Sequence, residues 1–90
     1  MRPKKPKKIS FEAKHNHFSP LTQQHIITEE ILLDKEELEA IRLKDFENLN
    51  QEECSRLMDI SQPTFHRLLK QARKKVALML IKGQSLKIKI

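Results

Sequence analysis

The chain has 90 residues, a length that suits one domain with a modest core and leaves little room for an enclosed active site. It contains four Phe but no Trp or Tyr, so the core must be mainly aliphatic. A single Cys excludes an internal disulfide bond. Because the sequence also shows no signal-peptide pattern, we expect a reducing, cytoplasmic setting. The longest apolar run, Val76 to Ile81, is too short to span a membrane, so no membrane association is expected.

The net charge of +6 is unevenly distributed along the chain. Residues 1–28 carry six Lys or Arg and one Glu. Residues 29–59 carry four Lys or Arg and eleven Asp or Glu, and residues 60–90 carry eight Lys or Arg and no acid. Two basic ends around an acidic middle predict a basic face for a polyanion. The acidic segment would then turn away from that polyanion, or it could pair with the basic segment across the core.

The first eight residues, MRPKKPKK, combine five cations with two prolines that block helix and sheet. We predict a flexible basic arm at residues 1–8, followed by a single domain at residues 9–90. The arm could lie on phosphates or in a minor groove, or it could act only as a solubilising tail. Its candidate phosphate contacts are Arg2, Lys4, Lys5, Lys7 and Lys8.

Residues 9–24 are weakly patterned, and we expect Phe11 and Phe18 to be anchors that pack onto the domain. His15, His17 and His25 could be metal ligands only if further ligands converged on them in space. No C-x-x-C or H-x-x-x-H spacing supports such a site. We therefore interpret them as solvated histidines and expect no metal and no cofactor.

A short strand is predicted within residues 26–33, near Ile31 to Leu33, followed by a helix that Asp34 caps. Glu37 completes a D-x-x-E capping box, and the acids of the first turns suit the helix dipole. These acids are too many and too regular for a catalytic carboxylate pair. The face expected to cover the core comprises Leu38, Ile41, Phe46 and Leu49.

Residues 50–81 carry the pattern of a helix-turn-helix: a short helix, a three-residue break and a longer helix. Asn50 is a good N-cap with Glu53 as its capping-box partner. The second helix should begin just after Ser61 or Gln62, with Pro63 in its first turn. Ser55 provides the small residue that lets the two helices approach. The first helix places Cys54, Leu57 and Met58 on one apolar face. The apolar stripe of the second helix comprises Phe65, Leu68, Leu69, Ala72, Val76 and Leu80. The positions that the motif must bury are Cys54, Met58, Ile60, Phe65 and Leu68.

The turn itself places Asp59 where such motifs commonly carry Gly. That position needs a left-handed backbone, which Asp tolerates better than most residues. We therefore predict a left-handed Asp59 at some cost in strain.

The outer face of the second helix is rich in hydrogen-bond donors, and the chain has no acid after Asp59. A merely solvated face would normally mix both signs of charge, so the pattern favours nucleic-acid binding. Gln suits adenine and Arg suits guanine through paired hydrogen bonds in the major groove. The candidate base contacts are Gln62, His66, Arg67 and Lys70, and the candidate phosphate contacts are Gln51, Thr64, Arg73, Lys74 and Lys75.

The end of the chain predicts a left-handed helix cap at Gly83 and a terminal strand within residues 85–90. Residues 26–33 would pair with that strand, within the chain or from a second copy. The helix end at Val76–Ile81 is apolar almost all round, which predicts a homodimer. The fold class is therefore mainly α: a three-helix, helix-turn-helix domain with short strands.

With these residues laid out, the chain resembles a small prokaryotic family of unknown function, domain of unknown function 134. The likeness covers Arg2–Phe11, Leu33–Glu53, Ser61–Ala77 and Lys82–Ile88. It includes the specific run S-x-P-T-F-x-R-x-L followed by A-R-x-K-V. The helix-turn-helix of that family is similar to region four of bacterial sigma factors, which implies DNA binding without naming a target. Asp59 stands here where relatives usually have Gly, and Cys54-Ser55 where many have two alanines.

The leading hypothesis is a sequence-specific protein that binds double-stranded DNA, a transcriptional regulator whose recognition helix begins near residue 62. The alternative is a sigma-like interaction module that docks on RNA polymerase or another part of the transcription machinery. RNA binding is less favoured because exposed aromatic residues for base stacking are nearly absent. An enzyme is not expected, because no nucleophile–base pair is evident and the single Gly excludes a Gly-rich phosphate loop.

Overall fold

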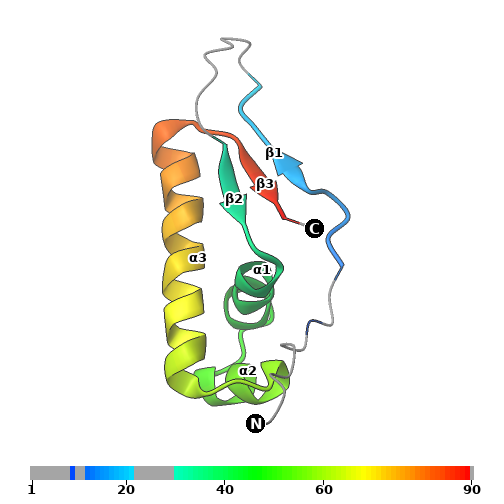
Figure 1. Cartoon of the computed structure of the whole chain (residues 1–90), viewed down its shortest axis with the longest axis vertical. Coiled ribbons are helices and arrows are strands. Elements are labelled where there is room, and N and C mark those ends of the chain that lie inside the picture. The colour runs from blue at the N-terminus through cyan, green and yellow to red at the C-terminus, as the bar shows by residue number, and fades with distance from the viewer. Residues whose placement is uncertain (1–8, 10–11, 22–29, 90) are drawn as a thin grey trace, which may run out of the picture.

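The computed structural model describes residue 9, residues 12–21 and residues 30–89. Within these residues the chain forms three α-helices and a small three-stranded sheet (Figure 1). The long helix α3 runs the length of the molecule, with the sheet beside its C-terminal half and α2 across its start (Figure 1). In chain order the elements are β1 His17–Phe18, β2 Ile31–Leu33, α1 Lys35–Ile41, the π-helical turn η1 Arg42–Phe46, α2 Gln51–Met58, α3 Gln62–Lys82 and β3 Leu86–Ile88.

The sheet has the order β1-β3-β2, with β3 antiparallel to β1 and parallel to β2. Ile31 lies opposite Leu86 and Leu33 opposite Ile88, and these four side chains are buried against the helices. The predicted terminal strand thus finds its partner within the same chain. Residues 26–29 of the predicted strand lie outside the described residues, and β1 was not predicted.

The helix ends lie where the sequence predicts them. The Asp34 backbone N–H donates to Glu37 Oε1 at 2.9 Å, and the Glu53 backbone N–H donates to Asn50 Oδ1 at 2.8 Å. Ser61 caps α3, since its Oγ accepts from the Thr64 backbone N–H at 3.3 Å. Gly83 ends α3 with a φ of 66°. These local signals are confirmed because each one satisfies backbone groups that a helix leaves unpaired at its end.

The turn between α2 and α3 has the predicted left-handed residue. Asp59 has φ 59° and ψ 44°, and the Ile60 backbone N–H donates to Ser55 O at 3.0 Å. Ser55 is buried, as expected for the small residue at the close approach of the two helices. The turn therefore directs the start of α3 across α2 and fixes the angle of the helix-turn-helix.

The hydrophobic core consists of two clusters that meet along α3. The three helices enclose the first cluster, in which Cys54, Met58 and Phe65 are fully buried. The sheet, α1 and α3 enclose the second, which joins Ala72 to the inner side chains of β2 and β3. The first cluster holds the helix-turn-helix together, and the second anchors the C-terminal half of α3.

The prediction that Phe46 covers the core is wrong: its side chain is 80% exposed. The helix that begins at Lys35 continues as η1, where the Glu47 backbone N–H donates to Arg42 O, five residues back. This wider turn rotates Phe46 away from the core and leaves Leu43 buried in its place. Asn48 then ends the segment in a left-handed conformation, with φ 66°.

Three other apolar predictions are also wrong. Leu57 is half-exposed, because α2 buries a narrow face at Cys54 and Met58. Leu80 is 72% exposed, since the sheet lies on the side of α3 that presents Met79. Phe18 is 46% exposed on β1 and does not act as a buried anchor. Phe11 lies outside the described residues.

An ion pair between buried Glu37 and Lys75 ties α1 to α3. Lys75 Nζ lies 2.7 Å from Glu37 Oε1, and the Glu37 side chain is only 2% exposed. On the other side of α1, Arg42 donates through Nε and Nη2 to the buried carboxylate of Glu39, and this hydrogen bonding raises the pKa of Arg42. The expectation that the acidic segment pairs with the basic helix is therefore confirmed at Glu37.

The backbone of Asp59 gives the first testable prediction. We expect the Asp59→Gly variant to be more stable than Asp59→Ala by about 1 kcal/mol, because Gly adopts positive φ without a Cβ clash. The greater entropy of unfolded Gly offsets part of that gain. Both changes remove the Asp59 carboxylate, so the difference reports on the Cβ and the backbone conformation. Urea unfolding measures it, and equal stabilities would contradict a strained turn.

The Glu37–Lys75 pair gives the second. Lys75→Met should lower the free energy of unfolding by about 1–3 kcal/mol, because it leaves a buried carboxylate without its cation. Lys74→Met is the matched control: its side chain is exposed, so it should change stability by less than about 0.5 kcal/mol. Urea unfolding of both variants decides the matter. Similar losses for the two would show that Glu37 does not depend on Lys75.

Candidate nucleic-acid interface

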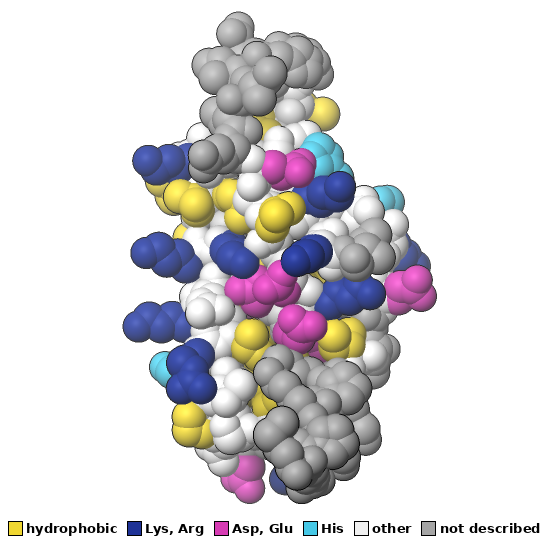
Figure 2. Space-filling view, in the orientation of Figure 1, with side chains coloured by type: hydrophobic (Ala, Val, Ile, Leu, Met, Phe, Trp, Pro, Cys, Tyr) yellow, Lys and Arg dark blue, Asp and Glu magenta, His cyan; other side chains and the backbone are white. Residues whose placement is uncertain are grey.

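The outer face of α3 presents a row of cations and polar donors. Figure 2 shows Lys and Arg side chains projecting along α3, with acidic side chains gathered over α1. No residue of α3 is acidic. All four candidate base contacts are exposed on this helix: Gln62, His66, Arg67 and Lys70. The candidate phosphate contact Lys74 is exposed as well.

At the start of α3 a chain of hydrogen bonds links three side chains. Ser61 Oγ lies 2.8 Å from Thr64 Oγ1, and Arg67 Nη2 donates to Thr64 Oγ1 at 3.3 Å. Thr64, a candidate phosphate contact, is thus part of the helix cap and is half-buried. The contact to Thr64 holds the exposed guanidinium of Arg67 near the first turn of α3.

A hollow of about 160 Å³ between the start of α2 and the middle of α3 brings several candidates together. Gln51 comes from α2, while His66, Lys70 and Arg73 come from α3, and Leu69 also lines the hollow. Two of these are candidate base contacts and two are candidate phosphate contacts. The structure therefore joins residues that the sequence separates by up to 22 positions, Gln51 to Arg73, into one donor-rich concavity.

Arg73 also has an acidic partner that the sequence analysis missed. Its Nε donates to Asp45 Oδ2 at 3.0 Å, and its Nη2 donates to Asp45 Oδ1. The Arg73 guanidinium holds the pKa of Asp45 below its ordinary value, so this carboxylate stays ionised at neutral pH. The separate charges of the acidic and basic segments were a general signal for such pairing. They did not identify the partner, which is 28 residues away.

Lys75, although a candidate phosphate contact, has a structural role in the fold. Its ammonium group is engaged with buried Glu37 on the α1 side of α3. To reach a phosphate it would have to leave a carboxylate that has little access to water. The candidate contacts of the arm, Arg2, Lys4, Lys5, Lys7 and Lys8, lie outside the described residues.

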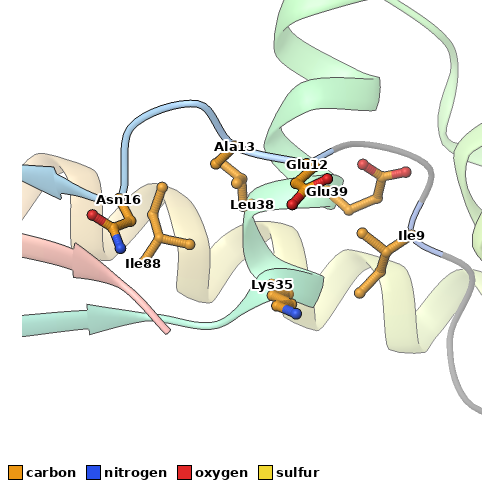
Figure 3. A pocket seen from close by; sticks show the side chains of 8 residues that line it. All are labelled: Ile9, Glu12, Ala13, Asn16, Lys35, Leu38, Glu39 and Ile88. Atoms are coloured by element: carbon orange, nitrogen blue, oxygen red, sulfur yellow. The ribbon is translucent and has the colours of Figure 1, made fainter. Parts of the chain in front are cut away.

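Two of the other hollows in the described part of the chain lie away from this face. One, of about 340 Å³, lies between α1 and the segment that precedes β1 (Figure 3). Its lining includes Ile9, Leu38 and Lys35. The other, of about 630 Å³, lies beside η1 and α2, next to Arg42 and half-exposed Leu57. Neither contains a candidate contact residue.

The described residues provide little for metal or thiol chemistry. No group of three or more of their His, Cys, Asp or Glu side chains is arranged to hold a metal. His17 Nε2 lies 3.0 Å from Glu30 Oε2 in an exposed pair, and His25 lies outside the described residues. Burial raises the pKa of the Cys54 thiol, which keeps it protonated at neutral pH.

Exposed apolar side chains gather at the far end of α3. Leu80 is 72% and Ile81 84% exposed, and Leu78 is also exposed. Leu32 of β2 is half-exposed on the outer face of the sheet. None of the helices in the described part of the chain is long and apolar enough to cross a membrane.

Comparison with known proteins places this chain among bacterial relatives. It is 51% identical over 87 residues to a UPF0251 protein of Clostridium novyi (strain NT), covering 97% of this chain and 59% of that protein. It is 46% identical to a UPF0251 protein of Clostridium botulinum (strain 657 / Type Ba4), with 97% and 55% covered. For a UPF0251 protein of Thermoanaerobacter pseudethanolicus the identity is 44%, with 97% and 74% covered.

The chain thus spans little more than half the length of the Clostridium relatives. No solved structure matches it. The family described as "Protein of unknown function DUF134" matches residues 1–90. This chain therefore belongs to the DUF134, or UPF0251, family.

Proposed function

We propose that this chain binds double-stranded DNA in a sequence-specific manner and acts as a transcriptional regulator. The observation that carries the proposal is the outer face of α3, which is exposed, rich in donors and free of acids. A helix with such a face, joined by a tight turn to a helix that crosses it, suits insertion into a major groove.

In this proposal the residues of α3 divide by their position along the helix. Gln62, His66, Arg67 and Lys70 contact base edges, since they occupy the exposed side of its first three turns. Gln51 and Arg73, which line the hollow from α2 and α3, hold the backbone of one strand, with Lys74 further along α3. Phosphate contacts fix the register of the protein on the duplex, and base contacts discriminate among sequences.

A second copy of the chain completes the proposed complex. Leu80 and Ile81 expose apolar surface at the end of α3 that lies away from the proposed DNA contacts (Figure 1). Joining two copies there would cover both apolar ends and leave both α3 starts free. Helix-turn-helix dimers bind half-sites about one helical turn apart on the DNA, roughly 34–36 Å, and we expect the same spacing here.

A specific observation also favours the alternative, an interaction module that docks on the transcription machinery. Half-exposed Leu57 lines the hollow next to η1 and α2, and Phe46 of η1 is largely exposed. Exposed aromatic and aliphatic side chains suit a partner protein better than they suit DNA. DNA binding remains the preferred proposal because the cations of α3 extend over a longer surface.

Arg67 provides the test of the proposed recognition helix. Arg67→Ala should weaken binding to the preferred site by about 1–3 kcal/mol and reduce the preference among sites, because a long donor can pair with a guanine edge. Sequencing of bound genomic fragments first identifies the site. Fluorescence anisotropy then compares that site with scrambled DNA.

Arg56→Ala is the matched control for this test. Arg56 is an exposed arginine on α2 that lines the hollow beside Leu57, away from the candidate contacts. The Arg56→Ala variant should leave the preference among DNA sites unchanged. Equal weakening of both DNAs by Arg67→Ala would show that α3 does not discriminate bases. No effect of Arg67→Ala on any DNA would favour the interaction module.

The dimer has its own test. The chain should sediment as a dimer at tens of micromolar, and replacing both Leu80 and Ile81 with Ser should shift it to a monomer by removing the apolar contact. Analytical ultracentrifugation measures both. Leu32→Ser, on the outer face of the sheet, is the control and should leave the dimer intact. A wild-type chain that is monomeric with and without DNA would exclude the proposed arrangement.

A further inference from the structure

We infer that Asp45 is a built-in competitor for the DNA backbone: in the free chain its carboxylate takes the donors of Arg73 that a phosphate would otherwise use. This inference rests on the proposed function and deepens it, because it names an acid outside α3 that sets the affinity of the interface. Asp45 belongs to η1, the π-helical turn that follows α1.

The geometry of the pair is that of anion recognition by arginine. Nε and Nη2 of Arg73 both donate to the Asp45 carboxylate, one to each oxygen. Arginine presents the same pair of parallel donors to carboxylates and to phosphates. A phosphate arriving at Arg73 must displace Asp45, or bind the remaining N–H groups beside a negative charge. Either route costs binding energy, whatever the DNA sequence.

The position of Arg73 makes the competition relevant to DNA. Arg73 lines the hollow that also contains Gln51, His66 and Lys70, the other candidate contacts of this concavity. The side chains of Arg73 and Asp45 are 52% and 39% exposed, so both water and a phosphate can reach the pair. An ion pair with this exposure is weak enough to exchange partners.

The second ion pair between the acidic segment and α3 shows the contrast. Glu37 is almost fully buried, and its carboxylate also accepts a backbone hydrogen bond from Asp34. Without Lys75, the Glu37 carboxylate would be left as an unpaired charge in a site with little water. The Glu37–Lys75 pair therefore holds the fold together, whereas the Asp45–Arg73 pair can open.

The inference predicts a change in the salt dependence of binding. A cation that is already neutralised within the protein releases few counterions when it meets DNA. Asp45→Asn should therefore tighten binding to a short mixed-sequence duplex about two- to fivefold. It should also steepen the log–log salt slope by about 0.9, one additional phosphate contact. Fluorescence anisotropy at about 50 to 200 mM salt measures both quantities.

Glu47→Gln is the matched control, because it changes the net charge by the same amount two residues further along. Glu47 pairs instead with Arg42 at 3.1 Å, and both residues line the hollow beside η1 and α2. This variant should leave the slope unchanged. Adding Arg73→Ala to Asp45→Asn should abolish both gains, which a general charge effect would not do. Thermal unfolding confirms that each variant is folded.

A second comparison retains Asp45 and so does not depend on the stability of its variant. Arg73→Ala should reduce the salt slope clearly less than Lys74→Ala does, since Arg73 is already neutralised. Equal behaviour of Asp45→Asn and Glu47→Gln would overturn the inference, and so would equal slopes for the Arg73 and Lys74 variants. Weaker binding by Asp45→Asn would also overturn it and would make Asp45 a support for Arg73. A wild-type chain without salt-dependent DNA binding would instead reject the proposed function.

Discussion

The close crossing of α2 over the start of α3 is the constraint on which the rest of the structure depends. It requires a left-handed residue at Asp59 and a small buried side chain at Ser55. With those two conditions met, Cys54, Met58 and Phe65 close into a core that water does not reach. In the described part of the chain, the same crossing leaves the opposite side of α3 exposed at Gln62, Arg67 and Lys70. Over the first turns of α3 this exposed face is polar, and it carries cations but no acid.

The acidic segment has two different relations to that basic helix. At α1 the carboxylate of Glu37 is buried, so its pair with Lys75 contributes to the docking of α1 on α3. At η1 the carboxylate of Asp45 lies at the surface and meets Arg73 where water competes. Burial decides between them: a pair shielded from water is costly to break, whereas a solvated pair can exchange for a phosphate.

The π-helical turn connects these features to the candidate interface. Its wider turn carries Phe46 away from the core and keeps Leu43 inside. It also ends the helix next to the middle of α3, where Asp45 reaches Arg73. Among the described residues, the turn therefore leaves Phe46 exposed while the preceding residue, Asp45, contacts the basic helix.

The sequence by itself determined the features that depend on neighbours along the chain. The caps at Asn50, Ser61 and Gly83, and the left-handed turn at Asp59, follow from backbone groups that a residue within a few positions must satisfy. The exposure of Gln62, Arg67 and Lys70 also follows from helical periodicity.

Only the tertiary structure decided features that depend on contacts between distant segments. The choice of Met79 over Leu80 depends on which side of α3 the sheet covers, since both fit helical spacing. The pairing of Asp45 with Arg73 depends on an extra residue within one turn, which no local pattern indicated. A helix can present a charge in any direction, and only the packing of its neighbours determines which charge it meets.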